Sequence, residues 1–263
     1  MTRAVVLARG LGTRMRANDP DAQLSADQAR AADAGFKAMM PVHGRPFLDY
    51  VLSTIADAGV EHVGLIVAPD HASIRAYYAQ HPPQRVRLHY IVQPDAIGTA
   101  NAMLHAEPWC GTDPFLVMNS DNLYPPAALR ALVELEEPGV AVFSRDGLVR
   151  ESNIPPQRIR SFALVDVDAD GYLARIVEKP PQDSGGHLVS MNCWRFDARI
   201  FEACRDVPRS ARGEFELPEA VGVAIARSAR IRCIRAAGAV LDLSTRADAA
   251  DVERRLTGLR PVP

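Results

Sequence analysis

Lysine is almost missing from this chain of 263 residues. Lysine and arginine together number 30, and the only two lysines are Lys37 and Lys179. Arginine therefore carries nearly all of the positive charge. A position that keeps lysine has a compact ammonium on a flexible stem instead of a planar fork, and an ammonium can sit between phosphate oxygens as a point charge. Both lysines are candidate site residues, although chance retention is the alternative for each.

The chain also lacks an excess of either charge. Its 30 basic and 32 acidic residues nearly cancel, which argues against a nucleic-acid-binding surface or a polybasic membrane surface. No run of eighteen apolar residues occurs, and the N-terminus has no signal-peptide pattern. We therefore expect a cytoplasmic protein with neither nucleic acid nor membrane as a partner.

Cysteine is scarce and unpaired in the sequence. The four cysteines form no C-x-x-C motif, and the seven histidines lack the spacing of metal ligands. A disulfide framework and a thiolate-bound metal are both disfavoured. The sequence predicts buried free thiols at Cys110, Cys193, Cys204 and Cys233.

Short apolar runs alternate with longer amphipathic segments in the first 150 residues. This alternation is typical of parallel strands joined by helices, and therefore of an α/β fold. Pro46 and Gly59 bracket one helix, while Asp70 and Thr99 are expected as N-caps of two more. The length and the uniform pattern favour a single domain over residues 1–263. The predicted strands are residues 4–8, 62–68, 86–92, 115–119 and 140–144.

The pattern of apolar and polar residues changes after residue 150. Residues 162–166 and 172–178, joined by an Asp-Gly turn, predict an antiparallel hairpin. The sheet should therefore be mixed. Further strands are expected at residues 187–196, 231–235 and 240–243, with a last helix at 247–256.

Residues 17–36 stand apart because they are rich in alanine and aspartate. Ser25 with Gln28 fits a capping box, and Gly35 fits a C-cap, so the sequence predicts a short inserted helix. Two interpretations remain open: a solvated surface helix, or a lid over the neighbouring glycine turn.

That glycine turn, residues 10–14, follows the first predicted strand. Gly10 and Gly12 let backbone N–H groups approach an anion, and the start of the next helix would add its positive end. Neither the P-loop pattern nor the full G-x-G-x-x-G fingerprint is present. Because Thr13 and Arg14 add a hydroxyl and a permanent cation, the turn favours a triphosphate over a dinucleotide.

Five motifs in this order resemble those of the sugar-1-phosphate nucleotidylyltransferases, over nearly the whole chain. The opening motif consists of residues 7–15 (LARGLGTRM), 37–42 (KAMMPV) and 45–51 (RPFLDYV). The later motifs are residues 93–100 (QPDAIGTA), 117–122 (VMNSDN), 178–180 (EKP) and 241–245 (LDLST). The resemblance implies a three-layer, Rossmann-like sandwich with a mixed, mostly parallel central sheet. It also implies transfer of a nucleotidyl group from a nucleoside triphosphate to a sugar-1-phosphate.

The resemblance assigns roles that agree with the needs of this chemistry. Two anions must be joined, so the site must supply cations and alignment. Asp121 and Asp242 would hold Mg²⁺ through hard oxygen ligands. Arg14 and Lys37 would bind the triphosphate, and Lys179 the sugar phosphate. A general base is not required, because a phosphate monoester is already largely ionised at neutral pH.

Further site residues are implied for the nucleotide and the sugar. The amide of Gln93 can donate and accept at once and so matches an imide edge, although a flipped amide could serve another base. Glu178 and Asn192 would bind sugar hydroxyls, and Ala163 stands where the family often has a glycine that contacts sugar. Arg9 replaces a usual Gly or Ala and would either face solvent or reach the nucleotide. The implied nucleotide-binding residues are Ala8, Gly10, Gly12, Thr13, Gln93, Gly98 and Thr99.

The leading prediction is therefore an enzyme that makes a nucleoside diphosphate sugar and pyrophosphate, with UTP or dTTP favoured. A non-catalytic nucleotide-sugar-binding subunit on the same fold is the first alternative, and a nicotinamide-dependent oxidoreductase the second. With about twenty residues after Asp242, no appended C-terminal domain is expected. The sequence leaves open the base, the sugar, the pathway and whether the chain forms a homo-oligomer.

Overall fold

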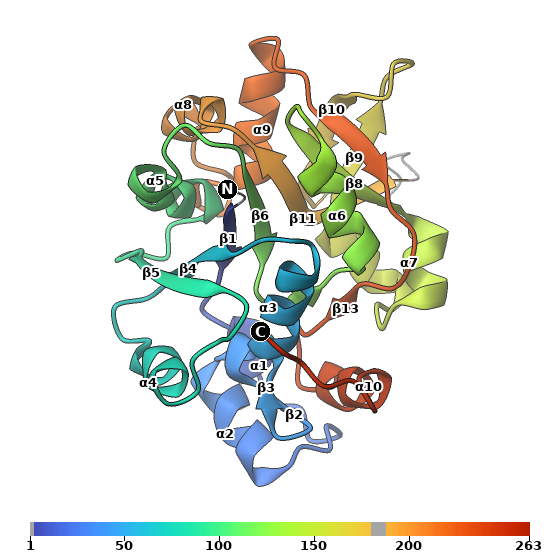
Figure 1. The fold of residues 1–263 in the computed structure, drawn as a ribbon. Helices are drawn as coiled ribbons and strands as arrows, with labels where there is room; N and C mark the ends of the chain where they lie inside the picture. Colours follow the sequence, from blue (N-terminus) through green and yellow to red (C-terminus); the bar gives the residue numbers. More distant parts are fainter. Residues whose placement is uncertain (1–2, 180–187) are drawn as a thin grey trace.

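A mixed β-sheet forms the centre of the molecule (Figure 1). The computed structural model describes residues 3–179 and 188–263. Strands in this part of the chain follow the order β10-β9-β11-β6-β1-β4-β5, and β8 pairs with both β11 and β12. Their bounds are β1 Arg3–Leu7, β4 His62–Val67, β5 Arg87–Val92, β6 Phe115–Asn119, β8 Gly139–Ser144, β9 Ala163–Val167, β10 Leu173–Val177, β11 Leu188–Phe196 and β12 Arg232–Arg235.

Strands β5, β4, β1 and β6 run parallel to one another, whereas β11 is antiparallel to β6, β8 and β9. β9 and β10 form the predicted antiparallel hairpin. The prediction of an α/β sandwich with a mixed, mostly parallel sheet is confirmed.

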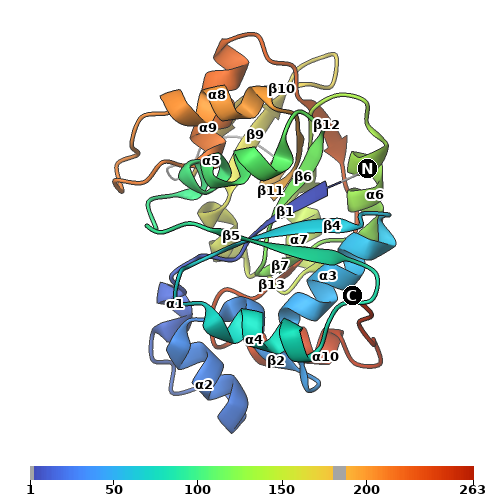
Figure 2. The ribbon, with the colours of Figure 1, turned by 60° about the vertical axis from the view of Figure 1, so that its left-hand side comes forward.

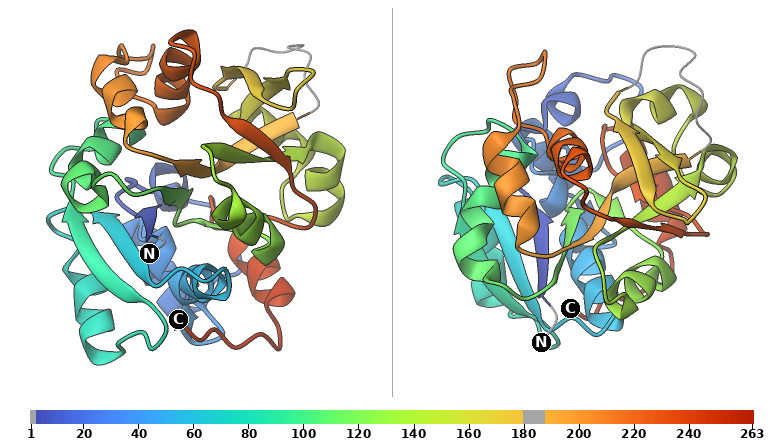
Figure 3. Two further views of the ribbon diagram at one scale, coloured as in Figure 1. Left: turned by 45° about the horizontal axis from the view of Figure 1, so that its top comes forward. Right: turned by 90° about the horizontal axis from the view of Figure 1, so that it is seen from above.

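Helices cover both faces of the sheet (Figures 2 and 3). Along β1, Ala4 and Val6 join one buried cluster, while Val5 joins another on the opposite face. This alternation follows from the two-residue period of a strand. The first cluster includes side chains of α3 (Phe47–Asp57), α4 (Ala72–Gln80), α6 (Pro126–Glu134), α7 (Arg145–Glu151) and α10 (Asp248–Arg255); the second includes α5 (Thr99–Cys110), α8 (Arg199–Asp206) and α9 (Leu217–Ala226).

Two short ribbons lie outside the central sheet. β7 (Asn122–Leu123) pairs antiparallel with β13 (Leu241–Asp242), and β2 (Pro41–Val42) pairs with β3 (Arg45–Pro46). The strand predicted at residues 240–243 is therefore shorter and belongs to the β7–β13 ribbon. This ribbon brings two distant parts of the chain together beside the end of β6.

The insertion between the glycine turn and Lys37 contains the predicted helix, α2 (Ala26–Ala34). The Ser25 hydroxyl accepts a hydrogen bond from the Gln28 N–H, and the Gln28 side chain accepts one from the Ser25 N–H, so the capping box is confirmed. Gly35 ends the helix with φ 74°, the left-handed conformation that glycine adopts without strain. η1 (Lys37–Met39) follows directly.

Two predicted N-caps are wrong. Helix α4 is capped at His71, and there the Asp70 backbone carbonyl, not the carboxylate, accepts a bond from Ala72. Helix α5 is capped at Gly98, since the Thr99 hydroxyl is already used: it accepts a bond from the Leu217 N–H at the start of α9. Thr99 therefore caps another helix.

The cysteines are free thiols, as expected, and Cys110, Cys193 and Cys204 are buried whereas Cys233 is half-buried. In the described parts of the chain, no helix has both the length and the apolar character that a membrane span needs.

Candidate active site

The loop after β1 carries the glycine turn, at the carboxyl end of the parallel strands. Gly12 has φ 64°, and a Cβ atom there would come within 2.2 Å of the Gly35 carbonyl oxygen. Both conformation and packing therefore require glycine at 12. A Cβ at Gly10, in contrast, would meet no atom within 4 Å. The space over Gly10 is open, which leaves its backbone accessible to a ligand.

Two adjoining cavities meet at this turn and share Leu7, Gly10, Lys37 and Thr99. We call the one that contains Asp121 the aspartate cavity (about 250 Å³) and the one that contains Arg14 the arginine cavity (about 350 Å³). Predicted site residues in the aspartate cavity are Ala8, Gly10, Lys37, Thr99, Asp121 and Asn192. Those in the arginine cavity are Gly10, Gly12, Thr13, Arg14, Lys37, Gln93, Gly98 and Thr99.

Lys37 and Asp121 form an ion pair in the aspartate cavity. The Lys37 Nζ lies 2.8 Å from the Asp121 Oδ2, and both side chains are largely shielded from solvent, with exposed fractions of 17% and 21%. Asp121 follows β6, and Lys37 is the first residue of η1. A lysine assigned to the triphosphate and an aspartate assigned to the metal are thus brought into direct contact.

Asp242 lies in β13, next to Asp121 in space. It pairs with Asn122 in the ribbon register, and the Leu243 N–H donates to the Asp121 carbonyl at 2.9 Å. Burial raises the pKa of Asp242, and the nearby Asp121 carboxylate raises it further. Asp242 Oδ1 accepts bonds from Asn122 Nδ2 and Ser244 Oγ, both at 2.9 Å.

Arg158 contacts Asp242, and the sequence did not reveal this contact. Its Nη1 lies 2.9 Å from Asp242 Oδ2 and 2.8 Å from Asp248 Oδ1, and its side chain is only 13% exposed. It comes from η2 (Pro156–Ser161), a segment with two arginines and no recognisable motif. Arg158 neutralises part of the acidic charge around Asp242 and fixes its orientation.

The donor set fits a magnesium-type ion. Asp121 and Asp242 supply carboxylate oxygens, and within residues 3–179 and 188–263 no group of three or more His, Cys, Asp or Glu side chains is placed to hold a metal ion. One or two carboxylates, with the rest of the shell left to water and substrate phosphates, is how proteins usually hold Mg²⁺. Asp121 and Asp242 are the residues that would hold such an ion.

Gln93, after β5, is buried (3% exposed) with a fixed amide. Its Nε2 donates to the Gly98 carbonyl at 3.0 Å and to Asn101 Oδ1 at 2.9 Å. A carbonyl can only accept, so the nitrogen must face Gly98 and the Gln93 oxygen must face the other way. Asn101, on the first turn of α5, was not identified from the sequence.

Gly98 is held against the segment before α9. It has φ 118°, and a Cβ there would lie 2.2 Å from the Phe215 carbonyl oxygen. The Phe215 N–H donates to the Ile97 carbonyl, and the Phe215 carbonyl accepts from the Ala100 N–H, both at 2.8 Å. Packing against Phe215 thus requires glycine here independently of any nucleobase.

Arg9 does not point into solvent but connects the turn to the Gln93 loop. Its Nη2 donates to the Pro94 carbonyl at 2.9 Å and its Nε to the Gln93 carbonyl at 3.3 Å. It lines the arginine cavity together with Arg212, a second cation that the sequence did not reveal. Arg212 also pairs with Glu216 at 2.6 Å.

The residues predicted for the sugar lie just after β10, in the middle of β11 and at the start of β9. Burial and then the Glu216 carboxylate raise the pKa of Glu178 to about 7, partly opposed by Lys179 and Arg212. Asn192 has φ 59° where the pairing of β11 with β8 shifts register, and it reaches the aspartate cavity. Ala163, Glu178, Lys179 and Asp242 line neither of the two cavities.

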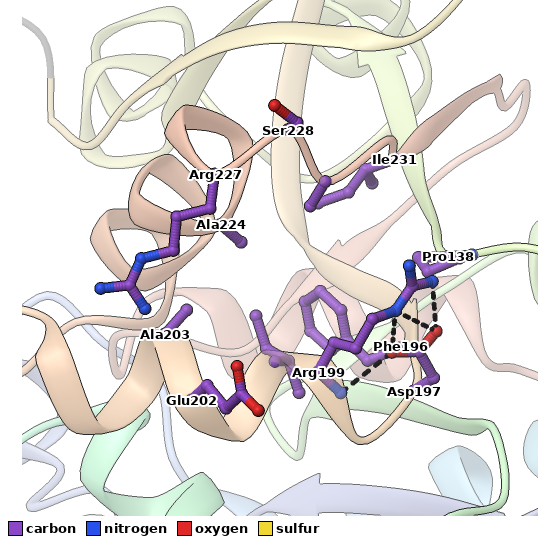
Figure 4. A pocket seen from close by; sticks show the side chains of 12 residues that line it. Pro138, Phe196, Asp197, Arg199, Glu202, Ala203, Ala224, Arg227, Ser228 and Ile231 are labelled. Atoms are coloured by element: carbon purple, nitrogen blue, oxygen red, sulfur yellow. Dashed lines mark hydrogen bonds and ion pairs between the residues drawn. The ribbon is translucent and has the colours of Figure 1, made fainter.

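Another cavity, of about 180 Å³, lies between α8 and α9, and none of the predicted residues line it. Figure 4 shows Arg199 bound to Asp197 at the rim of this cavity. Arg227 pairs with Asp206 at 2.8 Å.

The family model for nucleotidyl transferases matches residues 3–248. The chain belongs to the nucleotidyl transferase family. The resemblance inferred from five motifs, and the prediction of a transferase enzyme, are thereby confirmed.

Curated relatives of this nucleotidyl transferase carry sugar-nucleotide names. It is 28% identical to the UTP–glucose-1-phosphate uridylyltransferase AglF of Haloferax volcanii, with 96% of each chain covered. It is 30% identical to a glucose-1-phosphate thymidylyltransferase of Streptomyces antibioticus, over 96% of this chain and 65% of that protein. The chain therefore spans about two thirds of the latter relative.

Solved structures with the same fold include a UDP-glucose pyrophosphorylase complexed with UDP-glucose. That structure has a TM-score of 0.79 at 17% identity and covers 99% of this chain and 100% of its own. A UTP-bound UGPase from Acinetobacter baumannii has a TM-score of 0.75 at 20% identity, with 99% and 95% covered. At these identities the likeness establishes the fold.

Proposed function

We propose that this nucleotidyl transferase condenses UTP or dTTP with a hexose-1-phosphate, in the presence of Mg²⁺, to give a nucleoside diphosphate sugar and pyrophosphate. The observation that carries the proposal is the convergence of Arg14, Lys37 and Asp121 on two joined cavities at the glycine turn, with Asp242 adjacent to Asp121. The names of the curated relatives support the same substrate class.

In the proposed reaction, an oxygen of the sugar phosphate attacks the α-phosphorus of the nucleotide. The bond between the α-phosphorus and the bridging oxygen breaks, and pyrophosphate leaves with the electron pair. Asp121 and Asp242 would hold Mg²⁺, which would neutralise phosphate charge when bound. Arg14 and Lys37 stabilise the departing pyrophosphate, while Lys179 aligns the sugar phosphate.

The fixed amide of Gln93 favours a base with an N3–H donor. Its Nε2 is occupied by Gly98 and Asn101, so its oxygen can accept from the N3–H of uracil or thymine. Cytosine presents a lone pair at N3 and would be repelled. We expect UTP and dTTP to be used on the order of 10 to 100 times better than CTP, as is typical for one well-formed base contact.

Retention of the complete charged set supports catalysis over a binding-only role. Lys37 and Asp121 form a shielded ion pair, and Arg158 neutralises Asp242. A protein that only bound nucleotide sugars would need neither leaving-group cations nor a metal site.

The test is pyrophosphate release over a grid of nucleoside triphosphates and sugar-1-phosphates with Mg²⁺. We expect turnover with UTP or dTTP and a hexose-1-phosphate, and none without the sugar phosphate. Silence over the whole grid, from protein that is folded by circular dichroism, would refute the proposal.

A further inference from the structure

We propose that the inserted helix α2 is a fixed part of the nucleotide site: Gly35 and Arg246 are positioning residues that hold the glycine turn in place. The turn has little structure of its own. The helix that follows it, α1 (Thr13–Arg16), is a single turn long, and its N-cap residue, Gly12, has no side chain that could cap it. Something outside residues 10–16 must therefore fix the turn.

Gly35, the C-cap residue of α2, supplies one contact. It lies so close to Gly12 that a Cβ on Gly12 would reach its carbonyl oxygen at 2.2 Å, and a Cβ on Gly35 would lie 2.8 Å from the Leu11 carbonyl. Two left-handed glycines thus place backbone against backbone. Arg16 adds a bond from its Nη2 to the Ala34 carbonyl at 2.8 Å.

Arg246, near the other end of the chain, holds together the unit formed by the glycine turn, α1 and α2. Its Nε donates to the carbonyls of Met15 and Ala17, both at 3.0 Å, and its Nη2 pairs with Asp33 of α2 at 2.5 Å. Although Arg246 carries a full charge, its side chain is only 12% exposed. It closes α1 onto α2, and it stands four residues after Asp242, so it also ties this unit to the β7–β13 ribbon.

These contacts favour a third interpretation of residues 17–36. The helix shares a backbone contact with the turn through Gly35, and Arg246, which is 12% exposed, holds it there. The insertion is instead a buttress, meaning a support behind the turn. Because Gly35 lines the aspartate cavity, the buttress forms part of its wall.

Loss of this support should affect the nucleotide side of the site and not the sugar side. Loosening the buttress should displace Gly10, Gly12 and Arg14, which face the nucleotide in the proposed function, and leave Lys179 and Glu178 unaffected. The expected effect on nucleotide binding rests on the proposed function, whereas the support of the glycine turn by α2 does not. A small displacement of positioning groups can change catalytic parameters by large factors.

The experiment compares Arg246→Lys with Arg30→Lys. Arg246→Lys keeps the charge but cannot bridge two carbonyls and Asp33 at once. Arg30, exposed on the same helix α2 and paired only with Asp27 among the described residues, is the matched control. Two quantities are measured: hydrogen exchange of the peptide spanning residues 8–16 in the ligand-free protein, and KM for UTP and for the sugar-1-phosphate separately.

We expect Arg246→Lys to speed exchange of that peptide about tenfold and to raise KM for UTP about tenfold, with KM for the sugar-1-phosphate within about twofold. Arg30→Lys should change neither quantity. Gly35→Ala is a second test of the same kind, interpreted only if its melting temperature shows a folded protein.

Unchanged exchange in Arg246→Lys would overturn the buttress itself, whatever the enzyme does. Faster exchange with an unchanged KM for UTP would keep the buttress but remove the turn from the nucleotide site, and so would count against the proposed function. An equal rise in both KM values would show a general loss of structure and would also overturn the inference of a selective role.

Discussion

At the scale of single residues, the most informative fact is that the two lysines do different things. Lys37 is shielded and paired with Asp121, whereas Lys179 is exposed, with φ 43°, at the end of β10. In an arginine-rich chain both are conspicuous in the sequence. Only the structure links one of them to an aspartate 84 residues away.

Lys37→Arg should lower kcat/KM by about 100-fold. A guanidinium is larger and planar, so it cannot occupy the ammonium position 2.8 Å from Asp121 without displacing the nucleotide phosphates. Losing one positioned cation costs about this much in comparable sites. Steady-state pyrophosphate release measures it, with Arg30→Lys as the control for a harmless basic exchange; a Lys37→Arg enzyme within threefold of the parent would contradict the assignment.

Asp121→Asn should abolish turnover while the protein stays folded. The amide keeps the shape but removes the charge that Lys37 and a divalent cation would share. Circular dichroism and pyrophosphate release are compared on the same preparation. Near-normal activity would remove Asp121 from the metal site.

At the scale of elements, features that depend on neighbouring residues in the sequence can be separated from features that depend on tertiary contacts. The capping box at Ser25 and the strand at residues 115–119 could be predicted because they depend on neighbours in sequence. The N-cap predicted at Thr99 is wrong, because its hydroxyl accepts from α9, more than a hundred residues later. Arg158 and Asn101 were not predicted for the same reason: the fold brings Arg158 to Asp242 and Asn101 to Gln93.

Gly98→Ala should destabilise the protein by about 2–4 kcal/mol. The new methyl would meet the Phe215 backbone at 2.2 Å at a φ of 118°, so both backbone strain and overpacking apply. Urea denaturation measures the change. The matched control is Gly222→Ala in α9, where a Cβ meets nothing within 4 Å and where alanine should be neutral or stabilising by up to about 1 kcal/mol.

If Gly98→Ala unfolds at the same urea concentration as the parent, the segment from 96 to 100 is free to move away from Phe215. The packing argument for this glycine would then be wrong, and its proximity to the base would be the remaining explanation.

At the scale of the whole molecule, apolar patterning predicted the α/β class and the mixed sheet, whereas the site depends on where loops meet. Alternation along β1 places Ala4 and Val5 in buried clusters on opposite faces of the sheet. The β7–β13 ribbon, with two residues in each strand, is too short to leave a periodic signal. Yet it is the element that brings Asp121 next to Asp242.

Global stability should depend on pH through Glu178. Its pKa of about 7 lies above the ordinary carboxyl value of 4.5, because of burial and Glu216. The folded state therefore binds the proton more tightly than the unfolded state. The stability contribution is fully present below pH 4.5, falls between 4.5 and 7, and is constant above.

Glu178→Gln removes this dependence. The stability advantage of the variant over the parent should be larger at pH 8 than at pH 4.5, as measured by urea midpoints at both values. The groups that face Glu178, namely Lys179, Arg212, Glu216 and Glu219, remain in both proteins. A constant difference across pH would exclude Glu178 as the titrating group.

Because the sequence has only two lysines, chemical labelling of its amines can be assigned to single sites. An amine-directed acylating reagent has two side-chain amines to modify in the sequence, besides the α-amino group of the chain. One of them, the Lys37 ammonium, is held by Asp121 in a cavity wall and is 17% exposed. Mass-spectrometric footprinting with such a reagent would therefore record occupancy of the two proposed subsites directly, with nucleotide protecting Lys37 and sugar phosphate protecting Lys179, and without any engineered probe.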